Sequence, residues 1–256
     1  MRITILGCGT STGVPVLPLG WGVCDPSNPK NRRRRAAVLV EVGETRVLID
    51  CGPDIRAQLL DAGADRLDAV LVTHDHADHT HGIDDLRGFY LASRDKLPLY
   101  TAKETLERLH LRFDYIFKSR HGYPPICEGQ VIDMERPLVI GDLPPIRAFW
   151  QEHGSIWSLG FRIGDFAYST DLNALPEASF DVLAGTKLWV VDALRERPHP
   201  SHSHLEQTLA WIDRVGPDRA VLTHMTKDMD YDTLRRSLPD GVEPAYDGMT
   251  LTLESV

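Results

Sequence analysis

Short apolar runs alternate with segments of helical periodicity along the whole chain, and no clear linker separates them. Runs with alternating or continuous apolar positions between turn residues predict strands at 3–6, 38–42, 46–50, 69–72, 146–149, 158–163, 166–169, 188–191, 220–222 and 249–253. Apolar residues at helical spacing predict helices at 55–62, 83–93, 103–111 and 205–215. Because the runs at 38–42 and 46–50 flank Gly43-Glu44, we expect them to form a hairpin.

This alternation of strands and helices predicts an α/β fold. Two mixed β-sheets packed face to face with helices outside would give this order of elements, and so would one doubly wound sheet. The pattern breaks at 112–130, where aromatic residues and the pair Pro124-Pro125 interrupt the periodicity. We expect this segment to be either a lid or interface insertion or an irregular surface loop. Apart from it, the pattern predicts one domain over residues 1–256.

The composition narrows the classes of protein. With 256 residues, 42% of them hydrophobic and 25% charged, the chain is long enough to bury a core and is neither disordered nor fibrous. A formal net charge of −9 argues against general nucleic-acid binding, which depends on neutralising phosphates. The sequence shows no leader peptide, no apolar run of membrane-spanning length, and no C-x-x-C pair among its 4 cysteines. We therefore expect a cytoplasmic protein with free thiols and no membrane partner.

Residues 73–79, Thr-His-Asp-His-Ala-Asp-His, carry the strongest chemical signal, and they directly follow an apolar run. Imidazole and carboxylate are ligands that zinc, manganese and iron(II) accept. The spacing offers two neighbouring pockets, one formed by His74 and His76 and the other by Asp78 and His79. The alternative is a solvated polar loop, but so many metal-binding side chains in one loop contribute little to packing.

One loop cannot saturate two ions, so further ligands are expected at the ends of other strands. His153, Asp171 and His224 each lie at or beyond the end of an apolar run. The sequence Leu-Thr-His at His224 repeats the arrangement Val-Thr-His at His74. This repetition predicts two loops that meet at one rim of the fold.

The order of these residues gives the chain a family resemblance. The H-x-H-x-D-H motif at 74–79, followed by the three later residues, resembles the metallo-β-lactamase superfamily. It is similar in particular to the branch of PhnP-like phosphodiesterases and tRNA 3′-processing endonucleases. Flanking segments extend the resemblance over nearly the whole chain: Gly7-Cys8-Gly9-Thr10-Ser11, Val14-Pro15, Asp50-Cys51-Gly52-Pro53-Asp54, Gly82-Ile83-Asp84-Asp85-Leu86-Arg87 and Tyr246-Asp247-Gly248-Met249.

The resemblance implies a four-layer αββα sandwich with a dinuclear site at one edge. It implies two divalent ions per chain, zinc or manganese with iron as a third candidate, since His and Asp serve all of them. Asp171 is expected to bridge the ions, and Asp50 to orient the metal loop from behind the ligands. The other ligands divide between the ions as His74, His76 and His153 for one, and Asp78, His79 and His224 for the other.

The chain departs from this pattern at a second metal site. Relatives often hold a structural zinc with a cysteine cluster near 21–27 and a histidine beyond the last ligand. Here that segment contains only Cys24, and Lys227 replaces the histidine. One thiol and one lysine cannot close a tetrahedral zinc site, so we predict that the structural zinc is absent. The long glycine-proline arm that holds tRNA in many relatives also has no counterpart, which disfavours a tRNA substrate.

The resemblance also implies a mechanism. Two ions about 3.5–4 Å apart lower the pKa of a shared water towards about 7, and the metal-bridged hydroxide then attacks phosphorus. Asp78 is expected to orient the nucleophile. His202, just before the helix at 205–215, is expected to protonate the leaving group or bind phosphate, with His204 as the alternative donor. The structural alternative is capping of this helix by Ser203 among surface histidines.

The chain has one dense basic run, Lys30-Asn31-Arg32-Arg33-Arg34-Arg35. A solvated surface is the usual meaning of such a run. The alternative is that one or two of the arginines bind a terminal phosphate, because the guanidinium suits bidentate contacts.

Together these observations predict a dinuclear metal-dependent phosphodiesterase. The expected substrate is a small phosphodiester, with ribose cyclic phosphates and 2′,3′-cyclic nucleotides as candidates, and the expected assembly is a homodimer. An RNA-processing endonuclease of the same superfamily is the main alternative. A lactonase or thioesterase and a non-catalytic binding protein are less favoured, because the flanking segments indicate phosphate chemistry and every expected ligand is present.

Overall fold

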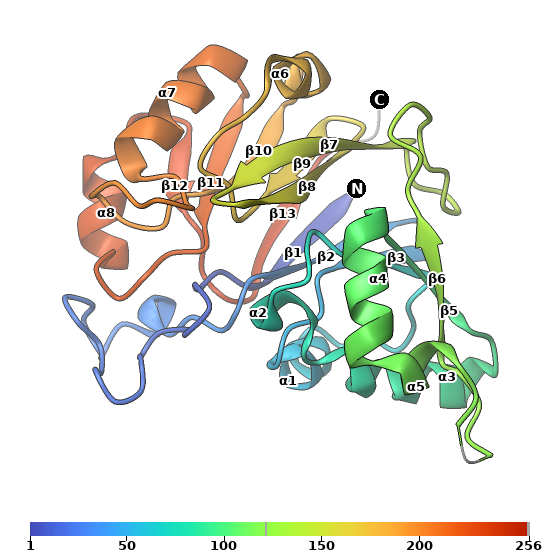
Figure 1. The fold of residues 1–256 in the computed structure, drawn as a ribbon. Coiled ribbons are helices and arrows are strands. Elements are labelled where there is room, and N and C mark those ends of the chain that lie inside the picture. Colours follow the sequence, from blue (N-terminus) through green and yellow to red (C-terminus); the bar gives the residue numbers. More distant parts are fainter. Residues whose placement is uncertain (121, 255–256) are drawn as a thin grey trace.

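Two mixed β-sheets pack face to face in a computed structural model of the chain, which describes residues 1–120 and 122–254 (Figure 1). Within this part of the chain, the first sheet has 7 strands in the order β13-β1-β2-β3-β4-β5-β6, and the second has 6 in the order β12-β11-β10-β9-β8-β7. Their bounds are β1 Arg2–Gly7, β2 Ala37–Val42, β3 Thr45–Ile49, β4 Ala69–Leu71, β5 Leu97–Thr101, β6 Cys127–Val131, β7 Ile146–His153, β8 Ile156–Ile163, β9 Phe166–Ser169, β10 Leu188–Asp192, β11 Arg219–Thr223, β12 Val242–Pro244 and β13 Met249–Thr252.

Helices cover the outer face of each sheet. Helix α1 packs on β1 and helices α4 and α5 on β6, whereas α6 packs on β7 and α8 on β12. Figure 1 shows α1 to α5 beside the first sheet and α6 to α8 beside the second. The helices are α1 Ile55–Asp61, α2 Ala77–Thr80, α3 Arg87–Ser93, α4 Lys103–Arg112, α5 Asp114–Phe117, α6 Glu177–Leu183, α7 Leu205–Val215 and α8 Tyr231–Ser237, with short 3-10 turns at Pro29–Asn31 and Ile83–Leu86.

The expected αββα sandwich is therefore confirmed, and a single doubly wound sheet is excluded. The apolar side chains divide as such layers require, because each sheet must bury both faces. One large cluster lies between the sheets and includes Ile3, Val40, Phe161 and Val190, all fully buried. A second cluster lies between the first sheet and its helices. All 4 cysteines are buried with free thiols, as predicted.

The segment at 112–130 is partly built into the first sheet. Strand β6 pairs in parallel with β5, and helix α5 buries Ile116 completely. Tyr123 lies on the surface with 70% of its area exposed. His121 lies outside the described residues. A lid or interface role for the exposed part of this segment stays a prediction.

Candidate metal centre

The metal loop leaves strand β4 and enters helix α2. His74 lies in the loop and is fully buried, His76 is the residue before α2, and Asp78 and His79 lie within its single turn. The sharp change of direction between β4 and α2 allows these side chains to turn towards one point. The predicted loop at a strand end is therefore confirmed, with the difference that its last two polar side chains belong to a short helix.

The other candidate ligands come from strand ends of the second sheet. His153 is the last residue of β7, Asp171 follows β9, and His224 directly follows β11. Asp171 and His224 have left-handed backbone conformations, with φ of 54° and 58°, and Asp50 at the end of β3 has φ of 65°. Such conformations are costly for residues other than glycine, and they gather at functional sites.

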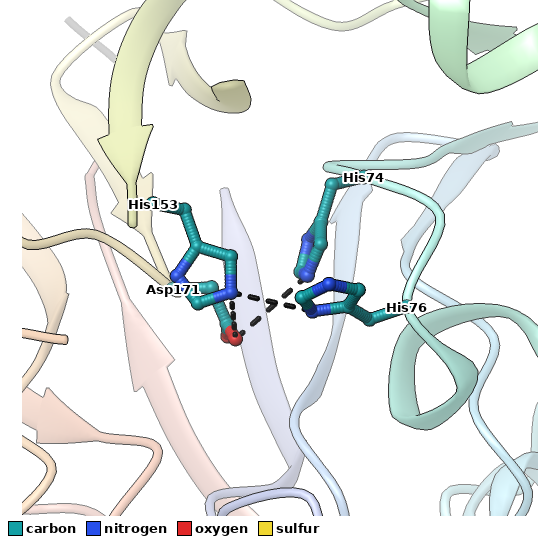
Figure 2. Close-up of side chains that lie close together, drawn as sticks. All are labelled: His74, His76, His153 and Asp171. Carbon is teal, nitrogen blue, oxygen red and sulfur yellow. Dashed lines mark hydrogen bonds and ion pairs between the residues drawn. The ribbon is translucent and has the colours of Figure 1, made fainter. Parts of the chain in front are cut away.

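Asp171 lies between two groups of imidazoles. Its Oδ2 atom is 3.8 Å from His74 Nε2 and 3.5 Å from His153 Nε2, and His153 Nε2 is 3.3 Å from His76 Nδ1. Figure 2 shows these three histidines around the Asp171 carboxylate, with His74 and His76 on one side and His153 on the other. The ligand atoms of the four side chains all lie within 4.8 Å of one another.

The second oxygen of Asp171 faces a second group. Oδ1 is 3.1 Å from both His79 Nε2 and His224 Nε2, and the same two nitrogens lie 3.2 and 3.5 Å from Asp78 Oδ2. The structure thus brings together all seven residues for which the sequence predicted metal binding. It divides them into the two expected sets, with the Asp171 carboxylate between them.

Hydrogen bonds behind the histidines fix their orientation. Asp50 accepts a bond of 2.7 Å from His79 Nδ1 and bonds of 2.8 and 2.9 Å from the Thr73 amide and hydroxyl. The Thr73 hydroxyl oxygen in turn lies 3.0 Å from His74 Nδ1, and the Ser201 carbonyl lies 2.6 Å from His153 Nδ1. With their Nδ1 atoms donating outwards, these histidines direct the Nε2 lone pair into the centre.

Close backbone contacts hold the loop from behind. The amide of Cys51 donates to the His79 carbonyl at 2.8 Å, and the amide of Gly82 donates to the Cys51 carbonyl at 2.9 Å. A Cβ atom at Gly52 would stand 1.9 Å from the Asp78 carbonyl oxygen, and one at Gly82 would stand 2.0 Å from the Gly52 oxygen. The glycines flanking the motif are therefore required by this contact.

His202 joins the centre through a carboxylate that the sequence analysis missed. Its Nδ1 donates to Asp192 Oδ2 at 3.0 Å, and its Nε2 lies 3.8 Å from Asp171 Oδ2. Burial lowers the pKa of His202, but Asp192, Asp171 and Asp78 outweigh it and raise that pKa to about 9. Asp192 ends strand β10, one residue beyond the predicted run, and its position after buried apolar residues resembles that of Asp50 at the end of β3.

The charges in the centre perturb one another strongly. Burial raises the pKa of Asp78, but His79 and His224 outweigh it and hold the pKa below its usual range. Burial lowers the pKa of His74, and the neighbouring His79 lowers it further. For His79, burial is opposed by the carboxylates of Asp171, Asp78 and Asp50, which raise its pKa well above the ordinary value.

Other histidines lie away from the two ligand sets. His204 precedes α7 and makes no side-chain cap, and Ser203 donates its hydroxyl to the Asp192 carbonyl at 2.8 Å. The structure therefore does not support the alternative in which Ser203 caps this helix. His81 packs edge-on against Phe113. His110 stacks on Phe117, and the ring of His199 lies 5.2 Å from that of His202.

The basic run is not a solvated surface, because its members have internal partners. Arg33 is 1% exposed, Arg34 pairs with Asp61 and Asp247, and Arg35 pairs with Asp54. Arg32 is exposed but lies over the Trp21 ring at 5.2 Å. Phosphate binding by Arg32 to Arg35 stays untested, and these contacts do not favour it.

The chemistry of the donor set fits divalent metal ions. The Nε2 atoms of His74 and His79 are buried without a hydrogen-bond partner among the described residues. With Nδ1 donating to Asp50, a neutral His79 would present its Nε2 lone pair to two carboxylate oxygens. Such lone pairs repel one another unless a cation lies between them. The residues present therefore match the group that the fold implies.

Known proteins place the chain in a family. Residues 45–225 match the Beta-lactamase superfamily domain. A crystal structure described as a new diphosphatase from the PhnP family is 33% identical, superposes with a TM-score of 0.91, and covers 99% of this chain and 98% of that one. The chain is a PhnP-like member of the metallo-β-lactamase superfamily. It is accordingly a metal-dependent hydrolase.

Two curated relatives add to this comparison. A ribonuclease Z of Mycolicibacterium gilvum is 32% identical to the PhnP-like chain over 258 residues, covering 88% of this chain and 84% of that protein. An octanoyltransferase of Porphyromonas gingivalis is 34% identical over 262 residues, which is 99% of this chain but 52% of that protein. The chain thus spans about half the length of the second relative, and the activity in that relative's name belongs to the longer protein. Among the described residues, no helix has the length and apolarity that a membrane crossing requires.

Proposed function

We propose that this protein is a dinuclear phosphodiesterase that hydrolyses a small phosphodiester, with cyclic ribose phosphates and 2′,3′-cyclic nucleotides as the leading candidates. The observation that carries the proposal is the arrangement of Asp171 between two sets of candidate ligands, with His202 directed at the same carboxylate. His74, His76 and His153 would hold one ion, Asp78, His79 and His224 the other, and Asp171 both. Ions held there would supply Lewis acidity, lowering the pKa of a bound water and neutralising charge on the phosphoryl group.

His202 is the proposed general acid. Because Nδ1 donates to Asp192, the proton that can be transferred is the one on Nε2, which faces the centre. In the metal-free protein, Asp192 leads the carboxylates that outweigh burial and raise the pKa of His202 to about 9. The Asp192 carboxylate thus favours the protonated imidazole that a leaving alkoxide requires. Asp78, held as a carboxylate by the neighbouring imidazoles, would orient the nucleophile.

A phosphodiester panel assayed with Mn²⁺ and Zn²⁺ tests this proposal. His202→Ala should lower kcat by roughly 10²–10⁴-fold while bound metal is retained. His204→Ala is the matched control and should leave kcat close to that of the wild type, because His204 lies outside the ligand sets. Full activity of His202→Ala, or loss of activity in His204→Ala alone, would remove His202 from the mechanism.

A diphosphate linkage is the second candidate substrate, since the similar crystal structure is described as a diphosphatase. RNA processing is the third, because of the likeness to ribonuclease Z. Parallel assays on a small cyclic diester, a diphosphate ester and a precursor tRNA separate these activities. Turnover of a lactone or thioester panel without any phosphate activity would reject all three, and failure to bind added metal would favour a non-catalytic protein.

The remaining parts of the proposal concern the protein as a whole. We propose a single hydrolase domain that acts as a cytoplasmic homodimer, with two ions per chain and no separate structural zinc. Light scattering tests the dimer, and metal analysis after dialysis tests the stoichiometry. A third tightly bound zinc per chain would contradict the last point.

A further inference from the structure

A cavity of about 730 Å³ lies beside the metal centre, between helix α4 and the segment formed by β7, β8 and α6. Its lining includes Asp75, which stands between His74 and His76 in the metal loop, and Ser155, two residues beyond His153. The cavity therefore adjoins the metal loop through Asp75, although no candidate ligand is among its lining residues. A volume of this size is in the range of pockets for small organic ligands.

Aromatic side chains form one wall of the cavity. Trp150 and Trp157 lie with their ring centroids 6.1 Å apart at 71°, and Phe149 and Ile156 line the space beside them. Trp157 is 52% exposed, although it is one of the largest apolar side chains. An exposed indole beside an apolar cavity is suited to stacking on a flat ring.

The charges around the cavity determine which ring it favours. Asp75 is neutralised by Arg108 at 2.9 Å and by Arg112 at 2.7 Å. Glu104 and Glu135 also line the cavity, and neither forms an ion pair within the described part of the chain. Their carboxylates repel a phosphate chain but accept hydrogen bonds from ring amino groups.

From this geometry we infer that the cavity binds the nucleobase of a nucleoside phosphodiester whose phosphate lies at the metal centre. The inference rests on the proposed phosphodiesterase function, to which it adds the substrate class. Trp157 stacks on the base, and the Glu104 and Glu135 carboxylates accept its exocyclic N–H bonds. The base is thereby a specificity element that lies away from the reacting bond.

Binding of adenosine, which has no phosphate, tests the cavity independently of catalysis. Adenosine should quench the tryptophan fluorescence of the wild type, and Trp157→Ala should weaken its binding about ten-fold or more, with partial rescue in Trp157→Phe. Trp21→Phe is the control, because Trp21 lies under Arg32 and outside the cavity. Absence of adenosine binding, or tighter binding of 1-hexanol than of adenosine at the same cavity, would overturn the inference.

Hydrolysis assays test whether a base bound in the cavity promotes catalysis at the metal centre. The ratio of kcat/KM for adenosine 2′,3′-cyclic phosphate to that for the base-free ribose cyclic phosphate should exceed one and fall about ten-fold in Trp157→Ala. An unchanged ratio with active enzyme would reject the base site and leave the phosphodiesterase proposal intact. Adenosine binding that depends on Trp157 without hydrolysis of either ester would reject the phosphodiesterase proposal and retain the base site.

Discussion

Arg33→Met should destabilise this protein more than any other substitution in the basic run. The guanidinium of Arg33 is buried, with Nη1 donating to the Thr226 carbonyl at 3.0 Å and Nη2 donating to the Met229 carbonyl at 2.6 Å. Longer contacts join it to Cys24 Sγ at 3.7 Å and to Asn31 Oδ1 at 3.4 Å. One side chain therefore ties the loop near the N-terminus to the segment that follows strand β11.

The expected loss follows from the two carbonyls. Methionine fills much of the apolar volume but donates no hydrogen bond. The Met229 carbonyl would lose the bond from Arg33, and a buried carbonyl left without a partner costs about 1–3 kcal/mol. The Thr226 carbonyl would keep the bond from the Met229 amide at 3.3 Å and lose one worth about 0.5–1.5 kcal/mol. Removing the buried charge also removes its desolvation cost, so we expect a net loss of about 2–4 kcal/mol in the free energy of unfolding. Because Thr226 and Met229 lie just beyond His224, the second set of candidate ligands should also bind metal more weakly.

Urea unfolding with a chelator present measures this loss without a contribution from bound metal. Arg32→Met is the matched control, because Arg32 is exposed and its guanidinium lies over the Trp21 ring at 5.2 Å. It should change stability by no more than about 0.5 kcal/mol. Equal stabilities of the Arg33 and Arg32 variants would refute the reasoning. Arg33→Lys should recover only part of the loss, since one ammonium group replaces a planar fork of donors.

Three further substitutions test the centre. Asp50→Asn should weaken metal affinity about 10–100-fold in chelator competition, because it removes the carboxylate that accepts hydrogen bonds from His79 and Thr73; unchanged affinity would contradict this. Gly82→Ala should lower the free energy of unfolding in urea by about 1–3 kcal/mol, because the added Cβ would stand 2.0 Å from the Gly52 carbonyl oxygen. Gly88→Ala is the control and should not destabilise the protein, because a Cβ there has no neighbour within 4 Å. Asp192→Asn should lower the pKa of His202. In metal-free protein, the stability that charged His202 contributes is fully present below about pH 6.5 and is lost as the pH rises through about 9. The free energy of unfolding of Asp192→Asn should therefore fall most below that of the wild type near pH 6 and little near pH 10. An equal loss at both pH values would argue against an ion pair.

The candidate ligands could be predicted from the sequence because each follows an apolar strand. Polar residues that end buried strands of a sandwich meet at one rim, and this local rule located His74, Asp171 and His224. The same rule would have located Asp192 if the predicted strand at 188–191 had been extended by one residue to the end of β10. Most strands and the long helices α4 and α7 were likewise predictable from periodicity.

Several elements lacked such a local signal. Strand β12 has only 3 residues, and β6 contains Gly129 and exposed polar positions, so neither has a clear strand pattern in its own sequence. Each forms because it pairs with a neighbouring strand, β12 with β11 and β6 with β5. Helices α6 and α8 have 7 residues each and form because their apolar faces pack on β7 and β12. Isolated helices of this length are marginal, so tertiary contacts decide their formation.

The sequence by itself determined the family, the layered fold and the residues able to hold metal. Ligand chemistry and strand periodicity can be recognised in this way because they depend on residues that are close together in the chain. Only the tertiary structure decided that Asp192 accepts a hydrogen bond from His202, that Arg33 is buried rather than solvated, and that a cavity adjoins the metal loop. These features depend on contacts between segments far apart in the chain. Their energies come from burial and from hydrogen bonds that exist only after the two sheets have packed.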